Sequence, residues 1–136
     1  PVTRLEAAQM LLPLADDQLP APELTDTAEE AARRAAANRF FPLEKGCFAP
    51  RRTISRQEMA TVAMQACGVN YRNASSTMPV CTDVDRVANN YGTNAARALY
   101  FGFMQLEADG RFDPERPVSR KEAVEILDRV ADFAGL

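Results

Sequence analysis

GCFAPRRTISRQEMA (residues 46–60) and GRFDPERPVSRKEAV (residues 110–124) are two copies of one sequence pattern. They align without a gap as G-x-F-x-P-x-x-x-[I/V]-S-R-x-E. A third and shorter copy opens the chain, where VTRLEAA (residues 2–8) repeats the end of the pattern. An internal repeat indicates a repeated structural unit, so we take this pattern as the feature that decides the fold.

Each copy ends in the sequence signature of a helix N-terminus. A residue that favours the N-cap position is followed three residues later by a glutamate. The pairs are Thr3 and Glu6, Ser55 and Glu58, and Ser119 and Glu122. This spacing is a capping box, in which each side chain accepts a hydrogen bond from the backbone N–H of the other residue.

Apolar residues recur at helical spacing after each cap, which predicts helices over about 4–15, 56–67 and 120–133. Pro13 should end or kink the first of these helices near its last turn. Gly68 and Gly135 should lie just past the ends of the other two.

Two further helices are predicted upstream of the complete copies, over residues 27–39 and about 92–101. The first of these segments is rich in alanine and charged residues, a composition that favours a helix. Asp26 stands just before it and is expected to be its N-cap.

Composition excludes several classes of protein. The chain has 136 residues, of which 46% are hydrophobic, and this suits one compact domain. A net charge of −3 is opposite in sign to that of most nucleic-acid-binding proteins, so we expect no nucleic-acid partner. No apolar run reaches about 18 residues, so we expect no membrane insertion. Because histidine is absent, we expect no enzyme, no metal site and no cofactor.

The repeat resembles the S-layer homology (SLH) module. The F-x-P turn followed by [S/T]-R-x-E carries the resemblance, and Thr82-Asp83-Val84, Gly102-Phe103-Met104 and Asp109-Gly110-x-Phe112 follow the order of the family's upstream motifs. The resemblance covers nearly the whole chain. It divides the chain into a partial module (1–23, core helix about 4–15), a shortened second module (24–80) and a third module (81–136). The tryptophan that the family usually carries after its Asp-Val pair is absent.

The resemblance implies an all-α fold in which the modules have a pseudo-threefold arrangement. The three [S/T]-R-x-E helices would form a central three-helix bundle, and the other helices and loops would form peripheral lobes. The residues support a single compact unit independently, because helices this short need to bury their apolar stripes against one another.

The function that the resemblance implies is cell-surface anchoring. The chain would bind an anionic, pyruvylated secondary cell-wall polysaccharide without a covalent bond. It would lie outside the cell, at the wall or S-layer of a bacterium, as part of a larger surface protein. The alternative is a structural or protein-interaction module that keeps the fold without binding glycan.

The arginine of [S/T]-R-x-E is the candidate ligand-binding residue of each copy, namely Arg4, Arg56 and Arg120. A cation at the first helical position opposes the helix dipole, so its repeated presence indicates a specific role. A helix N-terminus with a guanidinium is a good anion site, and the resemblance places this arginine in the grooves between lobes. Asp83 and Gly102, from the matched upstream motifs, complete the candidate set. The alternative is that each arginine only fastens a neighbouring lobe.

Two pairs of residues and one acidic stretch have two interpretations each. Phe48 and Phe112 are expected to pack in the core rather than to stack on sugars. Cys67 and Cys81 flank a polar segment that a disulfide would close, or they are free thiols that pack as small hydrophobic residues. The acidic stretch 107–113 lacks the spacing of a calcium loop and is expected to be an ordinary turn.

Overall fold

The computed structural model describes residues 1–68, 81–87 and 91–135. Within these residues it holds α-helices and no strands, which confirms the predicted all-α class. The helices are α1 (Arg4–Leu11), α2 (Glu30–Ala37), α3 (Arg56–Cys67), α4 (Gly92–Tyr100) and α5 (Arg120–Ala134). Short 3₁₀ turns occupy Leu12–Leu14 and Val84–Arg86. In this part of the chain no helix combines the length and the apolar character needed to cross a membrane.

The helix ends follow the local sequence signals, with one exception. α1 stops at Leu11 and Pro13 lies in the 3₁₀ turn that follows, as predicted. α3 and α5 end at Gly68 (φ +62°) and Gly135 (φ +80°), which take the left-handed conformation that favours glycine. The prediction that Asp26 caps α2 is wrong. Its carboxylate instead accepts hydrogen bonds from two backbone N–H groups of the 46–50 turn.

Two of the three capping boxes are complete. Thr3 and Ser55 each exchange both hydrogen bonds with their glutamates. Ser119 accepts a bond from the N–H of Glu122, at 3.1 Å, but the return bond is missing. The Glu122 carboxylate is engaged elsewhere, by the guanidinium groups of Arg56 and Arg116.

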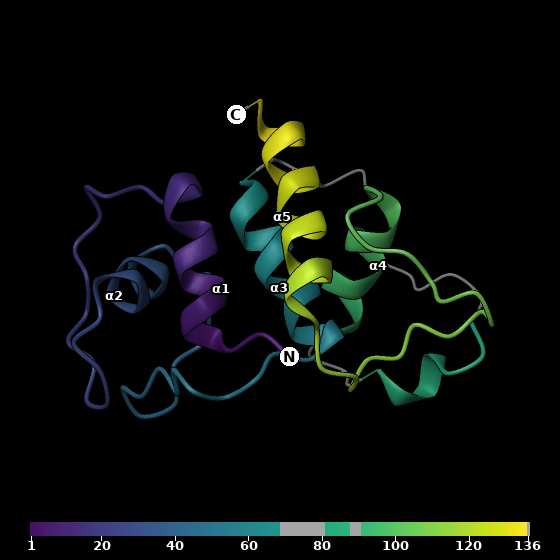
Figure 1. The fold of residues 1–136 in the computed structure, drawn as a ribbon, viewed down its shortest axis with the longest axis horizontal. Coiled ribbons are helices and arrows are strands. Elements are labelled where there is room, and N and C mark those ends of the chain that lie inside the picture. Colours follow the sequence, from purple (N-terminus) through teal and green to yellow (C-terminus); the bar gives the residue numbers. More distant parts are fainter. Residues whose placement is uncertain (69–80, 88–90, 136) are drawn as a thin grey trace.

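The helices that follow the caps lie at the centre of the molecule. Figure 1 shows α1, α3 and α5 in the middle, with α2 beside α1 and α4 beside α3. The residues before the three caps close a ring of backbone hydrogen bonds. Val2 N–H donates to Val118 at 2.8 Å, Val118 to Ile54 at 2.8 Å, and Ile54 to Val2 at 3.1 Å. This ring ties the starts of the three helices together, while the full pseudo-threefold arrangement of modules stays a prediction.

The phenylalanines of the repeated turns are core residues, as predicted. Phe48 and Phe112 are both fully buried. Phe48 packs edge-on against Phe41, with ring centroids 5.3 Å apart. Each F-x-P turn is therefore attached to the core by its aromatic ring.

The structure does not form the possible disulfide between Cys67 and Cys81. Both are buried free thiols, and Cys47 is a partly exposed one. The Cys67 thiol donates to the carbonyl of Met64 within its own helix, at 3.3 Å. Cys81 lies beside Asp83, and burial raises the pKa of its thiol. Residues 69–80, which the disulfide would have closed into a loop, are outside the described residues.

Candidate functional site

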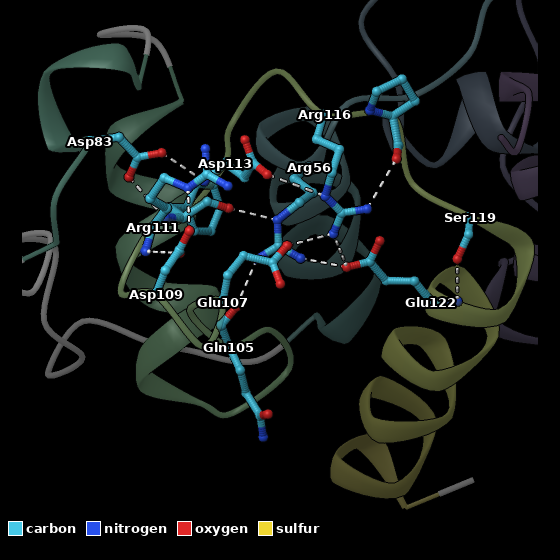
Figure 2. A network of polar contacts seen from close by, with 12 residues as sticks. Arg56, Asp83, Gln105, Glu107, Asp109, Arg111, Asp113, Arg116, Ser119 and Glu122 are labelled. Carbon is cyan, nitrogen blue, oxygen red and sulfur yellow. Dashed lines mark hydrogen bonds and ion pairs between the residues drawn. The ribbon is translucent and has the colours of Figure 1, made fainter.

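Arg56 is the centre of a polar network that joins α3 to the 105–112 segment and to α5 (Figure 2). Arg56 is buried, at 3% exposure. Nε donates to the carbonyl of Phe112 at 2.6 Å and Nη2 to that of Gln105 at 2.7 Å. Nη1 pairs with the carboxylate of Glu122 on α5. The guanidinium also lies over the Phe112 ring, 5.1 Å from its centroid. Arg56 thus holds the 104–112 loop and the start of α5 at the same time.

Arg4 repeats this arrangement at the start of α1. It is 2% exposed, and it donates from Nε to the Phe48 carbonyl at 2.6 Å and from Nη2 to the Pro42 carbonyl at 2.8 Å. Its guanidinium lies over the rings of Phe41 and Phe48, at 4.9 Å and 5.0 Å. Burial lowers the pKa of Arg4, and the carboxylate of Glu58 at 3.9 Å opposes that shift. We call this set of bonds around Arg4 or Arg56 a clasp.

The turn that each clasp holds also covers the N-terminus of the helix. The N–H groups of Arg4 and Leu5 donate to the carbonyls of Arg52 and Pro50, at 2.8 Å and 3.0 Å. In α3, the first two N–H groups donate in the same way to Arg116 and Pro114, both at 3.0 Å. The donors that would bind an anion at these two helix starts are therefore already bonded to protein carbonyls.

Asp83 supports the turn that Arg56 holds. It is 7% exposed and accepts hydrogen bonds from the N–H groups of Phe112 and Asp113, at 2.8 Å and 2.9 Å. Burial alone would raise its pKa, but these bonds prevail and lower it. Asp26 does the same for Phe48 and Ala49, at 3.0 Å and 2.8 Å. Asp26 and Asp83 therefore stabilise their two turns in the same way.

Gly102 and Arg39 are equivalent residues with the same unusual backbone. Gly102 follows α4 with φ +76°, and Arg39 follows α2 with φ +60°. Only glycine takes this left-handed conformation without strain. Arg39 is exposed, and it forms no ion pair with the described part of the chain. The sequence pattern gave no role to Arg39, so this residue was missed.

Arg120 differs from the other two motif arginines. Its side chain is 65% exposed, and its ion pair is with Glu6 of α1. The structure therefore separates three residues that the sequence pattern treats as the same. Arg4 and Arg56 are buried and hold the neighbouring turns in place, whereas Arg120 faces solvent.

A groove of about 470 Å³ lies between the 36–43 segment on one side and α3 with Tyr91, just before α4, on the other. We call it groove A, and it is lined by Ala36, Arg39, Phe41, Pro42, Leu43, Thr61, Gln65 and Tyr91. Arg4 fixes one wall, because it bonds the carbonyl of Pro42 and lies over the ring of Phe41. Burial raises the pKa of the Tyr91 phenol, and the negative charge of Glu58 adds to this. The Tyr91 side chain that lines groove A is therefore a neutral phenol at neutral pH.

An equivalent but smaller pocket, groove B, lies between the 104–107 segment and α5. Its volume is about 150 Å³, and Arg56 lies at its base. Its rim carries Glu107, Glu122 and Glu125 together with Arg129. Groove B is thus rich in carboxylates, whereas the charged group that lines groove A is the cation of Arg39. Among the described residues, no cluster of carboxylates and thiols is placed to hold a metal ion.

The ring, the clasps and the grooves define a helical domain in which the starts of α1 and α3 have the same local arrangement. Residues 82–124 match the family model described as S-layer homology domain. The chain therefore contains a module of the S-layer homology family, from the segment before Asp83 to the first turn of α5. A search of curated proteins found no match. S-layer homology domains anchor proteins at the cell wall and cell surface, and they are binding domains rather than enzymes.

Proposed function

We propose that this chain is a wall-anchoring unit of tandem modules (1–23, 24–80 and 81–136) that binds an anionic, pyruvylated secondary cell-wall polysaccharide in groove A. The observation that carries the proposal is Arg39. It is an exposed cation outside every ion pair of the described residues, at the edge of a groove of about 470 Å³. The surroundings would be those of a bacterial surface protein.

The lining of groove A suits a sugar that carries a carboxylate. The ring of Tyr91 and the apolar surfaces of Pro42 and Leu43 fit the apolar face of a pyranose. Thr61 and Gln65 supply a hydroxyl and an amide, which can both donate to and accept from sugar hydroxyls. The guanidinium of Arg39 matches a carboxylate in a planar two-bond contact. Groove A thus combines the three kinds of contact that such a ligand needs.

The backbone of Arg39 makes its removal a clean test. Arg39 has φ +60°, and its counterpart Gly102 shows that glycine serves the same backbone position. Lys45, Ala49 and Asp113 also have positive φ, so the strain of roughly 1 kcal/mol relative to glycine does not by itself mark a functional residue. Arg39→Gly therefore removes the cation without straining the backbone.

The residues predicted from sequence would act mainly by building the walls. Arg4 fixes groove A and Arg56 fixes groove B, Asp83 holds the turn beside groove B, and Gly102 allows the chain to leave α4. Arg120 would be an anion contact of its own, because its guanidinium is open to solvent. In this proposal, ligand binding therefore centres on Arg39, and Arg4 is a positioning residue.

The test is co-sedimentation with purified bacterial cell walls, before and after chemical removal of the wall polysaccharide. Arg39→Gly should reduce binding about tenfold or more, the loss expected for one charge-assisted contact. Arg51→Gly is the matched control, because Arg51 is also exposed but does not line either groove. Stripped walls should bind neither variant.

Two results would count against the proposal. One is an Arg39→Gly variant that binds walls as the wild type does, and the other is undiminished binding to stripped walls. Thermal unfolding checks that the variant is folded. Its midpoint should not fall, since glycine relieves the strain at position 39.

The alternative, a structural module without glycan binding, is favoured by the burial of Arg4 and Arg56. Both guanidinium groups are engaged by protein carbonyls, carboxylates and rings. A purely structural role, in which the arginines only hold neighbouring segments in place, requires no more than this. A folded wild type that binds no wall preparation would support this alternative.

A further inference from the structure

A further groove lies directly beside groove A, and its volume is about 540 Å³. One wall is formed by Leu19, Pro20 and Pro22, and the other is the end of α2 with Ala37 and Asn38. We call it groove C. It is at least as large as groove A, at about 470 Å³, and both are much larger than groove B, at about 150 Å³.

Arg39 is the boundary between grooves A and C. Two residues line both grooves, Ala36 and Arg39. Ala36 is buried and has only a methyl side chain, whereas Arg39 is exposed. A guanidinium has five N–H donors, so Arg39 can bond to a ligand that occupies both grooves.

The wall of groove C that carries the prolines is fixed to α2. Arg34 donates to the carbonyls of Asp17 and Leu19, at 2.8 Å and 2.9 Å. The side chain of Asn38 accepts from the N–H of Asp16 at 2.9 Å and donates to its carbonyl at 3.1 Å. The two prolines also restrict their own φ angles. Groove C is therefore formed before any ligand binds, and a ligand would lose little affinity in ordering it.

The chemistry of groove C is simpler than that of groove A. The amide of Asn38 is already bonded on both sides, to the backbone of Asp16 and to the carbonyl of Arg34. The other wall offers apolar surface, and its Leu19 is 38% exposed. Among the described residues that line groove C, Arg39 carries the charge. Apolar surface beside one cation suits the apolar face of an acidic sugar chain without selecting a particular pattern of hydroxyl groups.

We propose that groove C holds the sugar next to the one in groove A, so that the wall polysaccharide crosses Arg39 and occupies both grooves. The carboxylate would lie against the Arg39 guanidinium at the crossing. The ligand is then an acidic oligosaccharide of at least two units. Groove A, with Thr61, Gln65 and Tyr91, would select the sugar, and groove C would add affinity. This inference rests on the proposed function, because it extends the ligand assigned to groove A.

Charge favours one continuous ligand over two separate ones. Among the described residues, Arg39 is the one charged residue that lines either groove, and it lines both. Two separate acidic ligands would therefore compete for one guanidinium, and one carboxylate would stay unpaired. A single chain uses the cation once and places apolar sugar faces on both sides of it.

The experiment is competition between purified cell walls and soluble fragments of the wall polysaccharide. The fragments are sorted into single charged sugars and fragments of three sugars that contain one charged sugar. The ratio of their half-inhibiting concentrations is compared within each variant, so that changes in wall affinity cancel. For the wild type, the longer fragment should compete about tenfold more strongly, as expected for the burial of one apolar sugar face.

Leu19→Ser tests groove C. It keeps the Leu19 carbonyl that Arg34 binds, and thermal unfolding checks that the variant is folded. The advantage of the longer fragment should fall to about threefold or less, while competition by the single charged sugar stays unchanged. Leu12→Ser is the matched control, because Leu12 is 42% exposed and lines none of the three grooves.

Each outcome decides the inference. An advantage that falls in Leu19→Ser and persists in Leu12→Ser supports it. An equal advantage in all three proteins overturns it, because the added sugars then lie elsewhere. A wild type without any advantage, on which the single charged sugar still competes, also overturns it. In both cases the proposed function stands. Weaker competition by the single sugar in Leu19→Ser would overturn the division of tasks between the grooves. If no fragment displaces the chain from walls that it binds, the proposed function falls together with this inference.

Discussion

The three motif arginines should contribute very differently to stability, although the sequence around them is nearly the same. Arg56→Ala removes the donors to two carbonyls, those of Phe112 and Gln105, and the cation over the Phe112 ring. A buried acceptor left without a donor costs about 1–3 kcal/mol. Glu122 keeps a second partner, Arg116 at 3.1 Å, so its charge is not stranded. We therefore expect a loss of about 3–5 kcal/mol in the free energy of unfolding.

The other two substitutions follow from the same reasoning. Arg4→Ala also frees two carbonyls, but its acidic partner Glu58 is 3.9 Å away and keeps Arg52 at 3.0 Å. Its cost should be about 2–4 kcal/mol. Arg120→Ala breaks one solvent-exposed pair with Glu6, and such pairs contribute about 0–1 kcal/mol. The expected order of destabilisation is Arg56, then Arg4, then Arg120.

The assay is urea denaturation at pH 7, monitored by far-ultraviolet circular dichroism. Free energies of unfolding are compared only between variants whose free energy falls with urea concentration at the same slope. Arg56→Lys is the charge-preserving variant, and it should still be destabilised because an ammonium cannot span both carbonyls in one plane. The small effect of Arg120→Ala should disappear in about 1 M salt, since the pair is exposed. Equal losses for Arg56→Ala and Arg120→Ala would refute the assignment of Arg56 as a buried clasp.

The helix starts and ends could be predicted because their causes lie within a few residues. A capping box is complete within four positions, and a left-handed glycine ends a helix locally, as at Gly68. The burial of Phe48 and Phe112 followed from their fixed place before the proline of the turn. These features depend on sequence neighbours, and the repeat showed each of them twice.

The different roles of Arg4, Arg56 and Arg120 could not be predicted, because each depends on what a distant segment places over it. Asp26 is a similar case. A carboxylate that accepts backbone N–H bonds suits both a helix cap and a turn, and its partner Phe48 is 22 residues away. Groove A could not be predicted either, because its lining comes from segments as far apart in the sequence as Ala36 and Tyr91. Its cation, Arg39, shares a positive φ with Lys45, Ala49 and Asp113, so that conformation alone does not single it out.

Three further predictions concern the turns and caps. Asp83 has its pKa held below the ordinary 3.8 by the Phe112 and Asp113 N–H groups, in spite of burial. Its contribution to stability is therefore complete above that value and lost as the pH falls through the folded pKa. Asp83→Asn should lower the thermal midpoint at pH 7 and make the midpoint less dependent on pH below about 4. Phe112→Ala should cost about 3–5 kcal/mol in urea denaturation, because the ring is fully buried; a loss below 1 kcal/mol would place the ring outside the core. Ser55→Ala and Ser119→Ala should each cost about 0.5–2 kcal/mol. Ser55 should cost more, because its hydroxyl also donates to Glu58 at 3.1 Å and its capping box is complete, whereas the Glu122 carboxylate is drawn away from Ser119 to Arg56. If thermal midpoints show equal losses for both serines, the missing return bond at Ser119 has no energetic consequence.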